Sequence, residues 1–561
     1  MMERNFSCQL IQQCEKQPDK TIIHLLLEHE FHAISYRSLL TGATAYQRSL
    51  QACGVGPNEV VIIILPHSED LVYAYYGCVL NGSIPSIMPY LTEKLIPEKY
   101  RQDLESLFMI THPQGVITFK DFSEEIERLQ SDGREILYIE DIESLPDYES
   151  EESFNFPGVE RLPSDIALLQ HSSGTTGLQK GVALSHQAIF NQLTSYAKAL
   201  QIEPSDVIVS WLPLYHDMGL IAGFLMPIFL GIPLILMSPF DWVKAPYLLM
   251  QAISKFKGTL CWLPNFAYNF CAKKIRPRDL QDVDLSSLRA VINCSEPMRK
   301  SSHDLFIETF EPYGFKPTAI ATSYAMAENV FAVTQGGITY PVRYDEVDLK
   351  SFQEENYAKP ADLENQTVIM VSAGKPIDNV QIQIIDPVGN VLDERRIGEV
   401  VLKSNCMLSG YYNRDDATQE SFIDGYFKTG DFGYIADNEL FITGRKKDLI
   451  IVGGKNIYPK DIETIVMEVE GVYPGRVVAF GLFNDEKGTE DVIVIAEIDD
   501  GFLAKKEDIA REIRKKVTKE SAIALRNVML VERKWLIKTS SGKIARALNK
   551  KKYIDMIGRL E

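Results

Sequence analysis

The chain has 561 residues, of which 45% are hydrophobic, and a formal net charge of −19. This length predicts more than one domain, with enough apolar residues for a sizeable core. Nucleic-acid-binding proteins normally carry a basic face, so the acidic balance excludes nucleic acid as an expected partner.

The cysteines and the first residues indicate where the protein works. Eight cysteines show no Cys-x-x-Cys pair and no regular spacing, which predicts reduced, mostly buried thiols. Residues 1–5 lead into a polar, amphipathic stretch without the basic-then-apolar order of a signal peptide. We therefore expect a cytoplasmic protein.

Residues 1–440 alternate short apolar runs with amphipathic stretches. Residues 60–65, for example, are all Val, Ile or Leu and predict a strand, and residues 68–80 predict the helix that follows it. Repeated strand–helix units of this kind favour mostly parallel sheets.

Residues 171–181 read His-Ser-Ser-Gly-Thr-Thr-Gly-Leu-Gln-Lys-Gly. Glycines let backbone N–H groups approach an anion, hydroxyls add donors, and a lysine adds positive charge. Gln179 stands where the loop of P-loop ATPases has its second glycine. The segment therefore predicts a different phosphate-binding loop, with a flexible surface turn as the alternative. Its candidate binding residues are Ser172, Ser173, Gly174, Thr175, Thr176, Gly177 and Lys180.

Residues 218–240 carry no charge over about the length of a membrane span. Glycines and prolines interrupt them, so they predict a short apolar helix and then a strand at residues 232–237. A lone interrupted span would leave backbone groups without hydrogen-bond partners in lipid. Buried core is therefore favoured over a membrane span.

Residues 381 onwards show a different pattern. Short strands with turn signals, at 381–385 and 398–402, predict a β-rich subdomain. Residues 444–448 (Gly-Arg-Lys-Lys-Asp) form a polar break, and the rest of the chain is long enough for a separate small domain. Ile509, Ile513 and Val517 recur at helical spacing, so residues 503–519 predict an amphipathic helix with a basic outer face.

Six motifs follow the glycine loop in a fixed order. They are Pro-Leu-Tyr-His-Asp (213–217), Asn-Cys-Ser-Glu-Pro (293–297), Tyr-Ala-Met-Ala-Glu (324–328), Tyr-Phe-Lys-Thr-Gly-Asp (426–431), Gly-Arg-Lys-Lys-Asp (444–448) and Lys-Thr-Ser-Ser-Gly-Lys (538–543). With them the chain resembles, over its full length, the adenylate-forming superfamily of acyl-CoA synthetases, peptide-synthetase adenylation domains and luciferases.

The resemblance implies an α/β fold in two domains. The N-terminal domain, residues 1–444, would hold two mixed α/β sheet subdomains and a β-rich subdomain at about 375–444. The small mobile α+β domain would occupy residues 445–561, with Lys447 at the hinge between the two.

The resemblance also implies a role for each motif. Lys543 would supply positive charge where a carboxylate meets the α-phosphate of ATP, and Glu328 would bind Mg²⁺. Asp431 would accept hydrogen bonds from the ribose hydroxyls, with Arg445 as a companion donor. The adenine would lie between Tyr324, Ala325, Met326 and Ala327 on one side and Ser295, Glu296 and Pro297 on the other.

His216 matches a position at the entrance between the acyl pocket and the α-phosphate. A neutral imidazole there would gate the site or polarise the acid, and a purely structural histidine is the alternative. The expected acyl pocket, suited to a medium- or long-chain fatty acid, is lined by His216, Gly219, Leu220, Trp262 and Asn265.

Within the superfamily, residues 293–299 and 458–463 resemble those of fatty acyl-AMP ligases more than those of CoA ligases. Residues 340–365 form a polar, acid-rich stretch where fatty acyl-AMP ligases carry an insertion. Gly453 and Gly454 depart from that pattern, because CoA ligases use paired glycines along the pantetheine tunnel.

The implied reaction has two steps. ATP and a fatty acid give acyl-AMP and pyrophosphate, and the phosphopantetheine thiol of an acyl carrier protein then takes the acyl group. CoA as acceptor is one alternative, and a non-catalytic adenylate-binding protein is another. Carrier proteins are acidic, so a basic face of the C-terminal domain could receive one. The alternative is a solvated lysine-rich surface with no partner. The residues of this basic face are Lys505, Lys506, Arg514, Lys515 and Lys550 to Lys552.

Overall fold

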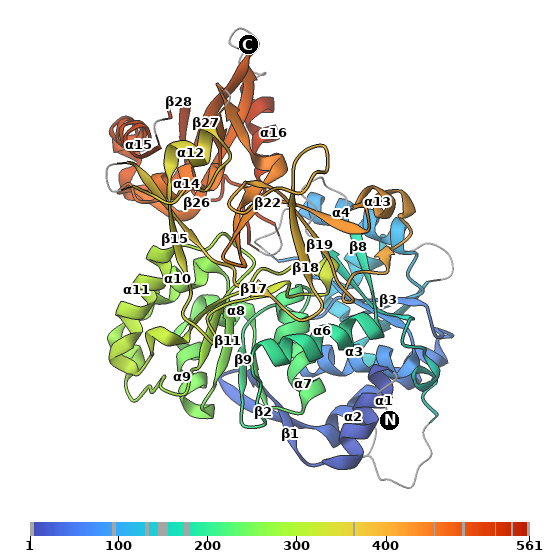
Figure 1. Cartoon of the computed structure of the whole chain (residues 1–561). Helices are drawn as coiled ribbons and strands as arrows, with labels where there is room; N and C mark the ends of the chain where they lie inside the picture. Colours follow the sequence, from blue (N-terminus) through green and yellow to red (C-terminus); the bar gives the residue numbers. More distant parts are fainter. Residues whose placement is uncertain are drawn as a thin grey trace.

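The computed structural model describes residues 5–92, 97–129, 134–143, 155–172, 180–362, 365–453, 455–484, 488–521, 523–539 and 542–557. The chain up to β23 builds a large body, and β24 to α16 build a smaller one beside it (Figure 1). The predicted α/β architecture, a large N-terminal part followed by a small α+β C-terminal domain, is confirmed. The exact boundary at residues 444 and 445 stays a prediction.

The largest sheet has seven strands, in the order β13-β12-β11-β9-β10-β1-β2. All its pairings are parallel except the edge pair β1/β2. The strands are β1 (Thr21–Leu27), β2 (Glu30–Ser35), β9 (Ile208–Ser210), β10 (Leu234–Met237), β11 (Leu260–Leu263), β12 (Ala290–Asn293) and β13 (Ile320–Thr322). Helices of the same part of the chain are α1 (Phe6–Lys16), α2 (Tyr36–Ala52), α6 (His186–Ala199), α8 (Pro239–Lys244), α9 (Tyr247–Phe256), α10 (Asn265–Lys274) and α11 (Lys300–Phe310).

A second sheet is parallel throughout. Its strands, in the order β4-β3-β5-β6, are β4 (Ile84–Ile87), β3 (Val60–Ile63), β5 (Gly115–Thr118) and β6 (Glu135–Tyr138). Helix α3 (Glu69–Asn81) starts at Ser68, whose hydroxyl accepts from Leu71 N at 3.2 Å, and ends at Gly82, whose φ of 73° suits glycine. The predicted strand and helix are therefore confirmed within two residues. Further helices here are α4 (Pro97–Thr111) and α5 (Ser123–Glu127).

Besides the two-stranded pairs β14 (Thr334–Gln335) with β17 (Lys375–Pro376) and β15 (Tyr344–Asp348) with β16 (Thr367–Val371), two larger antiparallel sheets belong to the large body. One holds β7 (Ile166–Ser172), β8 (Lys180–Ser185) and β20 (Gly410–Tyr411). The other holds β18 (Gln381–Ile385), β19 (Gly398–Lys403), β21 (Phe422–Ile423), β22 (Tyr426–Ala436) and β23 (Glu439–Arg445), which contain the strands expected at 381–385 and 398–402. A further short helix is α13 (Asp415–Glu420).

The uncharged stretch at 218–240 lies in the core. It forms a π-helix (Met218–Leu225), α7 (Met226–Leu230) and then β10. Gly219 is needed here, because a Cβ at this position would lie 2.2 Å from the carbonyl oxygen of Pro213. Within the ranges given above, no helix is long and apolar enough to cross a membrane.

Residues 344–371 form an arm that reaches the small domain. It consists of β15 (Tyr344–Asp348), α12 (Leu349–Glu354) and β16 (Thr367–Val371), and α12 lies beside the small domain in Figure 1. Lys455 Nζ lies 2.9 Å from Glu354 Oε1, and Asn456 Nδ2 donates to Asn356 Oδ1 at 2.6 Å. The predicted insertion thus contacts the C-terminal domain directly.

The small domain packs helices on both faces of a three-stranded sheet. Helices α14 and α15 cover one face, and α16 covers the other. Ile509, Ile513 and Val517 face its core, as predicted, but α15 begins at Lys506 because residues 500–505 form a 3₁₀ turn. Its elements are β24 (Ile450–Val452), β25 (Lys455–Ile457), α14 (Pro459–Met467), β26 (Val472–Asn484), β27 (Thr489–Ile498), α15 (Lys506–Ser521), β28 (Leu525–Val531) and α16 (Arg546–Ile557).

The cysteines agree with the sequence prediction. All eight are free, and six of them are buried. Burial raises the pKa of Cys261 and of Cys294 to about 12, so these thiols are protonated at neutral pH.

Candidate active site

The predicted phosphate loop is framed by two paired strands. Ser172 at the end of β7 pairs with Lys180 at the start of β8. Residues 173–179, which include Ser173, Gly174, Thr175, Thr176 and Gly177, lie outside the described residues. Lys180 Nζ lies 4.4 Å from the centre of the Tyr411 ring, so its charge stands at the base of the loop.

His171, which the sequence analysis did not single out, fixes the base of this loop. Its Nε2 lies 2.6 Å from the Ser86 hydroxyl, which joins β7 to the end of β4. Burial lowers the pKa of His171 to about 4, so the ring is neutral at physiological pH. No sequence signal in the loop distinguishes His171 from its neighbours. Its role becomes visible only in the fold, where Ser86 of β4 contacts it.

Glu328 meets a second residue that the sequence analysis missed. Tyr411 donates its hydroxyl hydrogen to Glu328 Oε1 at 2.9 Å, on the same ring that faces Lys180. Burial raises the pKa of Glu328, and the Tyr411 hydrogen bond opposes that shift. A neighbouring cation stabilises the charged form of a buried carboxylate strongly, so Glu328 is well suited to the predicted role of Mg²⁺ ligand. The described residues contain no group of three or more metal-ligating side chains, so phosphate oxygens would have to supply other ligands.

Asp431, Tyr324 and Arg445 come together through strand pairing. Asp431 on β22 is paired with Arg445 on β23, and Arg445 Nε lies 3.3 Å from Asp431 Oδ1. Tyr324 donates its hydroxyl hydrogen to Asp431 Oδ2 at 2.6 Å. The charge of Asp431 raises the pKa of Arg445, which secures its positive charge. Three residues from distant motifs thus form one polar cluster.

The segment 293–299 leaves the end of β12 in a tight turn. Ser295 has a φ of 67°, a left-handed conformation that is uncommon for a residue with a side chain. Glu296 Oε2 accepts from the backbone N of Phe266 at 2.9 Å, next to the start of α10. Across the site, Tyr324 to Ala327 are held by the backbone bond from Met326 N to Phe331 O at 2.9 Å.

The chain between the two bodies is anchored on each side of Lys447. Arg445 binds Asp431, and Lys446 Nζ lies 2.7 Å from Glu399 Oε2, so both belong to the large body. Asp448 lies 2.5 Å from Arg546 of α16 and belongs to the small domain. Lys447 is the residue between these anchors, and its role as a hinge stays a prediction.

Lys543 is carried by a turn of the small domain. Thr539 N donates to Lys543 O at 2.8 Å, and Lys543 N donates to the Thr539 hydroxyl at 3.2 Å. Burial pushes the pKa of Asp217 up, but the bond from His216 and the charges of His216 and Lys543 outweigh it and lower the pKa. The small domain therefore brings the charge of Lys543 to the 216–217 segment of the large body.

Comparisons with known proteins identify the family. Residues 10–412 match the family model of AMP-binding enzymes, and residues 454–551 match that of the AMP-binding enzyme C-terminal domain. The chain belongs to the AMP-binding enzyme family. The predicted adenylate-forming superfamily is confirmed.

Within this family, the chain is similar to ligases that are named for fatty acids. The medium-chain-fatty-acid–[acyl-carrier-protein] ligase JamA of Moorena producens is 29% identical over 94% of this chain and 91% of its own length. A structure from studies of fatty acyl-adenylate ligases of E. coli and L. pneumophila superposes with a TM-score of 0.90, at 25% identity, over 100% of this chain and 99% of its own. The L. pneumophila ligase in complex with acyl adenylate and pyrophosphate has a TM-score of 0.75, at 28% identity, over 99% and 97%.

In this AMP-binding enzyme, His216 is held by its neighbour. His216 Nδ1 lies 3.0 Å from Asp217 Oδ1, and that same oxygen accepts from Met218 N at 2.8 Å at the start of the π-helix. Asp217 therefore both caps the helix and orients the imidazole. This geometry is compatible with an oriented imidazole at the predicted entrance between the acyl pocket and the α-phosphate.

The remaining residues of the predicted acyl pocket lie deep in the enzyme. Leu220 and Trp262 are buried, and Trp262 Nε1 donates to Tyr196 OH at 2.9 Å. Asn265 donates to the Ser302 hydroxyl at 3.1 Å and accepts from Asn293 Nδ2 at 3.1 Å. These bonds give Trp262 and Asn265 structural roles, and their place in an acyl pocket stays a prediction.

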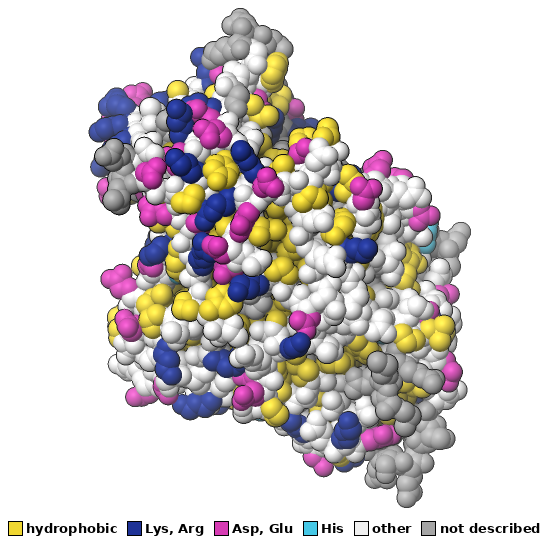
Figure 2. Space-filling view, viewed as in Figure 1, with side chains coloured by type: hydrophobic (Ala, Val, Ile, Leu, Met, Phe, Trp, Pro, Cys, Tyr) yellow, Lys and Arg dark blue, Asp and Glu magenta, His cyan; other side chains and the backbone are white. Residues whose placement is uncertain are grey.

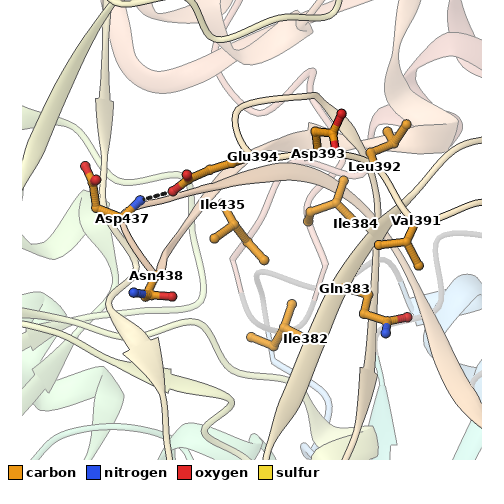
Figure 3. Close-up of a pocket in the computed structure, with 10 residues that line it drawn as sticks. All are labelled: Ile382, Gln383, Ile384, Val391, Leu392, Asp393, Glu394, Ile435, Asp437 and Asn438. Atoms are coloured by element: carbon orange, nitrogen blue, oxygen red, sulfur yellow. Dashed lines mark hydrogen bonds between the residues drawn. The ribbon is translucent and has the colours of Figure 1, made fainter.

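A surface pocket of about 420 Å³ lies outside this site, on the β18–β22 sheet (Figure 3). Ile382, Ile384 and Ile435 line it, and Glu394 and Asp437 stand together at one end, joined by a hydrogen bond from Asp437 N. None of the residues predicted to bind nucleotide, acid or metal lines it.

Proposed function

We propose that this enzyme activates a fatty acid with ATP and passes the acyl group to the phosphopantetheine thiol of an acyl carrier protein. A carboxylate oxygen attacks the α-phosphorus, and pyrophosphate leaves. The thiol sulfur then attacks the acyl carbon, AMP leaves, and the thiol proton goes to solvent. The proposal is supported by the charges that gather at the 216–217 segment, where His216 Nδ1 lies 3.0 Å from Asp217 Oδ1 and the charge of Lys543, on the small domain, helps to lower the pKa of Asp217.

Each residue cluster has one task in the first step. Asp431 and Arg445 would bind the ribose hydroxyls, with Tyr324 against the adenine. Lys180 and the loop after β7 would bind the outgoing pyrophosphate. Lys543 would stabilise charge on the carboxylate and α-phosphate as they approach.

Glu328 would hold Mg²⁺, and the ion would neutralise charge on the phosphates when bound. Tyr411 keeps one oxygen of this carboxylate oriented through its hydroxyl. The other cation of this region, Lys180, packs over the same ring. Tyr411 would thus contact the Glu328 carboxylate through its hydroxyl and the Lys180 ammonium through its ring.

The carrier protein is favoured as acceptor by the insertion. Lys455 and Asn456, which follow the paired glycines, are bound to Glu354 and Asn356 of the insertion. The residues directly after the paired glycines are therefore bound to the insertion, which supports a carrier protein over CoA as acceptor. JamA, which is similar over nearly the whole chain, is named as an acyl-carrier-protein ligase. CoA is the alternative acceptor.

The test is pyrophosphate exchange with a panel of carboxylic acids, followed by thioester formation on CoA and on a phosphopantetheinylated carrier. We expect exchange with medium- or long-chain fatty acids, and transfer to the carrier in excess of transfer to CoA. Exchange absent with every acid would refute acyl activation, and preferred transfer to CoA would refute the carrier as acceptor.

Lys543→Ala tests the residue on which the proposal depends. Loss of its charge removes stabilisation of the transition state, so we expect acid-dependent exchange to fall by about 10²-fold or more. ATP binding, measured by equilibrium dialysis, should persist, because Asp431, Arg445 and Lys180 lie in the large body. Lys534→Ala, at an exposed lysine of the same domain, is the matched control.

A further inference from the structure

The turn at residues 293–299 contacts the small domain directly. Arg299 Nη2 lies 2.6 Å from Asp461 Oδ1 of α14. Close by, burial lowers the pKa of Lys538 to about 8, and the neighbouring Glu296 carboxylate opposes that shift. One turn of the large body, which also carries Ser295 and Pro297 of the predicted adenine site, therefore contacts the small domain through the Arg299–Asp461 pair.

Arg299 is held firmly on its own side. Its backbone N donates to Asn265 Oδ1 at 3.1 Å, and it is the N-cap residue of α11. The Arg299 side chain is 21% exposed and that of Asp461 is 35% exposed. A partly buried ion pair is screened less by salt than a fully exposed surface pair.

Asp461 is in turn connected to Lys543. It lies in the first turn of α14, and Glu463 of the same helix lies 2.7 Å from Arg546 Nη2. Arg546 begins α16, three residues after Lys543. Glu463 is buried and the Arg546 side chain is 18% exposed, so this ion pair ties α14 to the segment that carries Lys543.

We propose that Arg299 is a positioning residue that latches the small domain in the pose of the acyl-adenylate-forming step. This inference rests on the proposed function. The pair joins the two bodies on either side of Lys447, so any rotation of the small domain about that residue breaks it. Arg299 therefore assists acyl-AMP formation and releases the domain before thiol transfer.

The test separates the two half-reactions in Arg299→Ala and Asp461→Asn. We expect the kcat of acid-dependent pyrophosphate exchange to fall about tenfold or more, since small displacements of a reacting group are costly. The KM for ATP should change less than about twofold, because no nucleotide-binding group is removed. Transfer from supplied acyl-AMP to the carrier should stay equal or become faster.

A double-mutant cycle shows whether the two residues act as a pair. Arg299→Ala combined with Asp461→Asn should be no slower than either single variant. The charge swap Arg299→Asp with Asp461→Arg should recover part of the lost exchange. Lys300→Ala is the matched control, since Lys300 pairs at 2.6 Å with Asp304 inside α11 and not with the small domain.

Three results would overturn the latch: unchanged exchange in both single variants, equal loss in both half-reactions, or a loss confined to the KM for ATP. Thermal melting checks folding, and the near-isosteric Asp461→Asn keeps the test valid if Arg299→Ala is unstable. If the wild-type enzyme shows no fatty-acid-dependent exchange, the proposed function fails instead. In that case spin-label distances between α11 and α14 still test the latch, and they should lengthen in Arg299→Ala.

Discussion

At the scale of single residues, the site depends on side chains that share one partner. Asp431 offers one oxygen to Tyr324 and the other to Arg445. Tyr411 similarly links Glu328 to Lys180 through its hydroxyl and its ring. Each shared residue fixes the orientation of two predicted functional groups. Its substitution should therefore lower the reaction rate more than the free energy of unfolding.

Tyr411→Phe tests this at Glu328. The Tyr411 hydrogen bond favours the charged carboxylate, so its removal should raise the pKa of Glu328, which burial already raises. Mg²⁺-dependent exchange needs the ionised Glu328 carboxylate, so it is present above the pKa of Glu328 and is lost as the pH falls below that pKa. The acidic limb of the pH profile of Mg²⁺-dependent exchange should therefore move to higher pH. Tyr412→Phe, on the adjacent tyrosine, is the control, and an unmoved acidic limb would refute this role of Tyr411.

At the scale of elements, the π-helix at Met218–Leu225 explains why two glycines stand beside His216 and Asp217. A Cβ on Gly219 would overlap the Pro213 carbonyl oxygen at 2.2 Å, and one on Gly223 would lie 2.7 Å from the Ser210 hydroxyl. Wider π turns at functional sites commonly reposition side chains. Close packing of this helix against residues 210–213 thus holds the His216 segment in place.

Gly219→Ala should destabilise the large body by about 1–3 kcal/mol, because the added methyl group meets backbone that cannot move freely. Urea unfolding followed by tryptophan fluorescence measures the change. Gly56→Ala is the control, since its Cβ would meet only Glu59 Oε2, at 3.8 Å. Equal stability of the two variants would contradict the packing argument.

The basic C-terminal face is smaller than the sequence indicated. Arg514 donates to Leu525 O at 2.7 Å, and Lys552 donates to Trp535 O at 2.7 Å, so both serve the small domain itself. Lys505 and Lys515 remain exposed on the α15 side, and Lys551 is exposed on α16, which covers the opposite face of the sheet. Figure 2 shows lysine and arginine side chains gathered at the outer side of the small domain, near α15.

Lys505→Glu with Lys515→Glu tests the α15 side of the small domain as a carrier-docking surface. An acidic carrier would lose electrostatic attraction, so the rate of carrier loading should fall and its dependence on salt should weaken. Exchange, which involves no carrier, should be unchanged. Lys273→Glu, at an exposed lysine of α10, is the control, and unchanged loading in the double variant would remove the proposed surface.

At the scale of the whole molecule, the chain passes from the large body to the small domain at residues 445–448. Arg445 and Lys446 are bound to the large body, and Asp448 is bound to the small domain. The Arg299–Asp461 pair and the insertion hold the two together in this arrangement. Rotation about Lys447 would have to break both contacts.

Lys447→Pro tests the hinge. Proline fixes φ and would restrict rotation at this position. We expect pyrophosphate exchange to remain within about threefold of wild type, while thioester formation on the carrier falls by about tenfold or more. Lys447→Ala, which removes the side chain but leaves the backbone free, should lower transfer less. Loss of exchange in both variants would instead assign the lysine side chain to the first step.

The sequence by itself determined the fold class, the family and the order of the motifs. Hydrophobic periodicity places β3 and α3 within two residues, because these elements follow local patterns of burial. The motifs at 324–328, 426–431 and 444–448 indicate which residues meet, since ligand chemistry limits the residue types at those positions.

Only the tertiary structure decided which residues act through others. Tyr411, His171 and Arg299 carry no signal of their own, because each owes its role to a partner about 80 to 160 positions away in the chain. Arg514 and Lys552 were predicted as charged surface residues, and the fold shows that each also donates a hydrogen bond to a backbone carbonyl, of Leu525 and of Trp535. Residue type is a local property, whereas contact depends on packing, and packing brings these distant segments together.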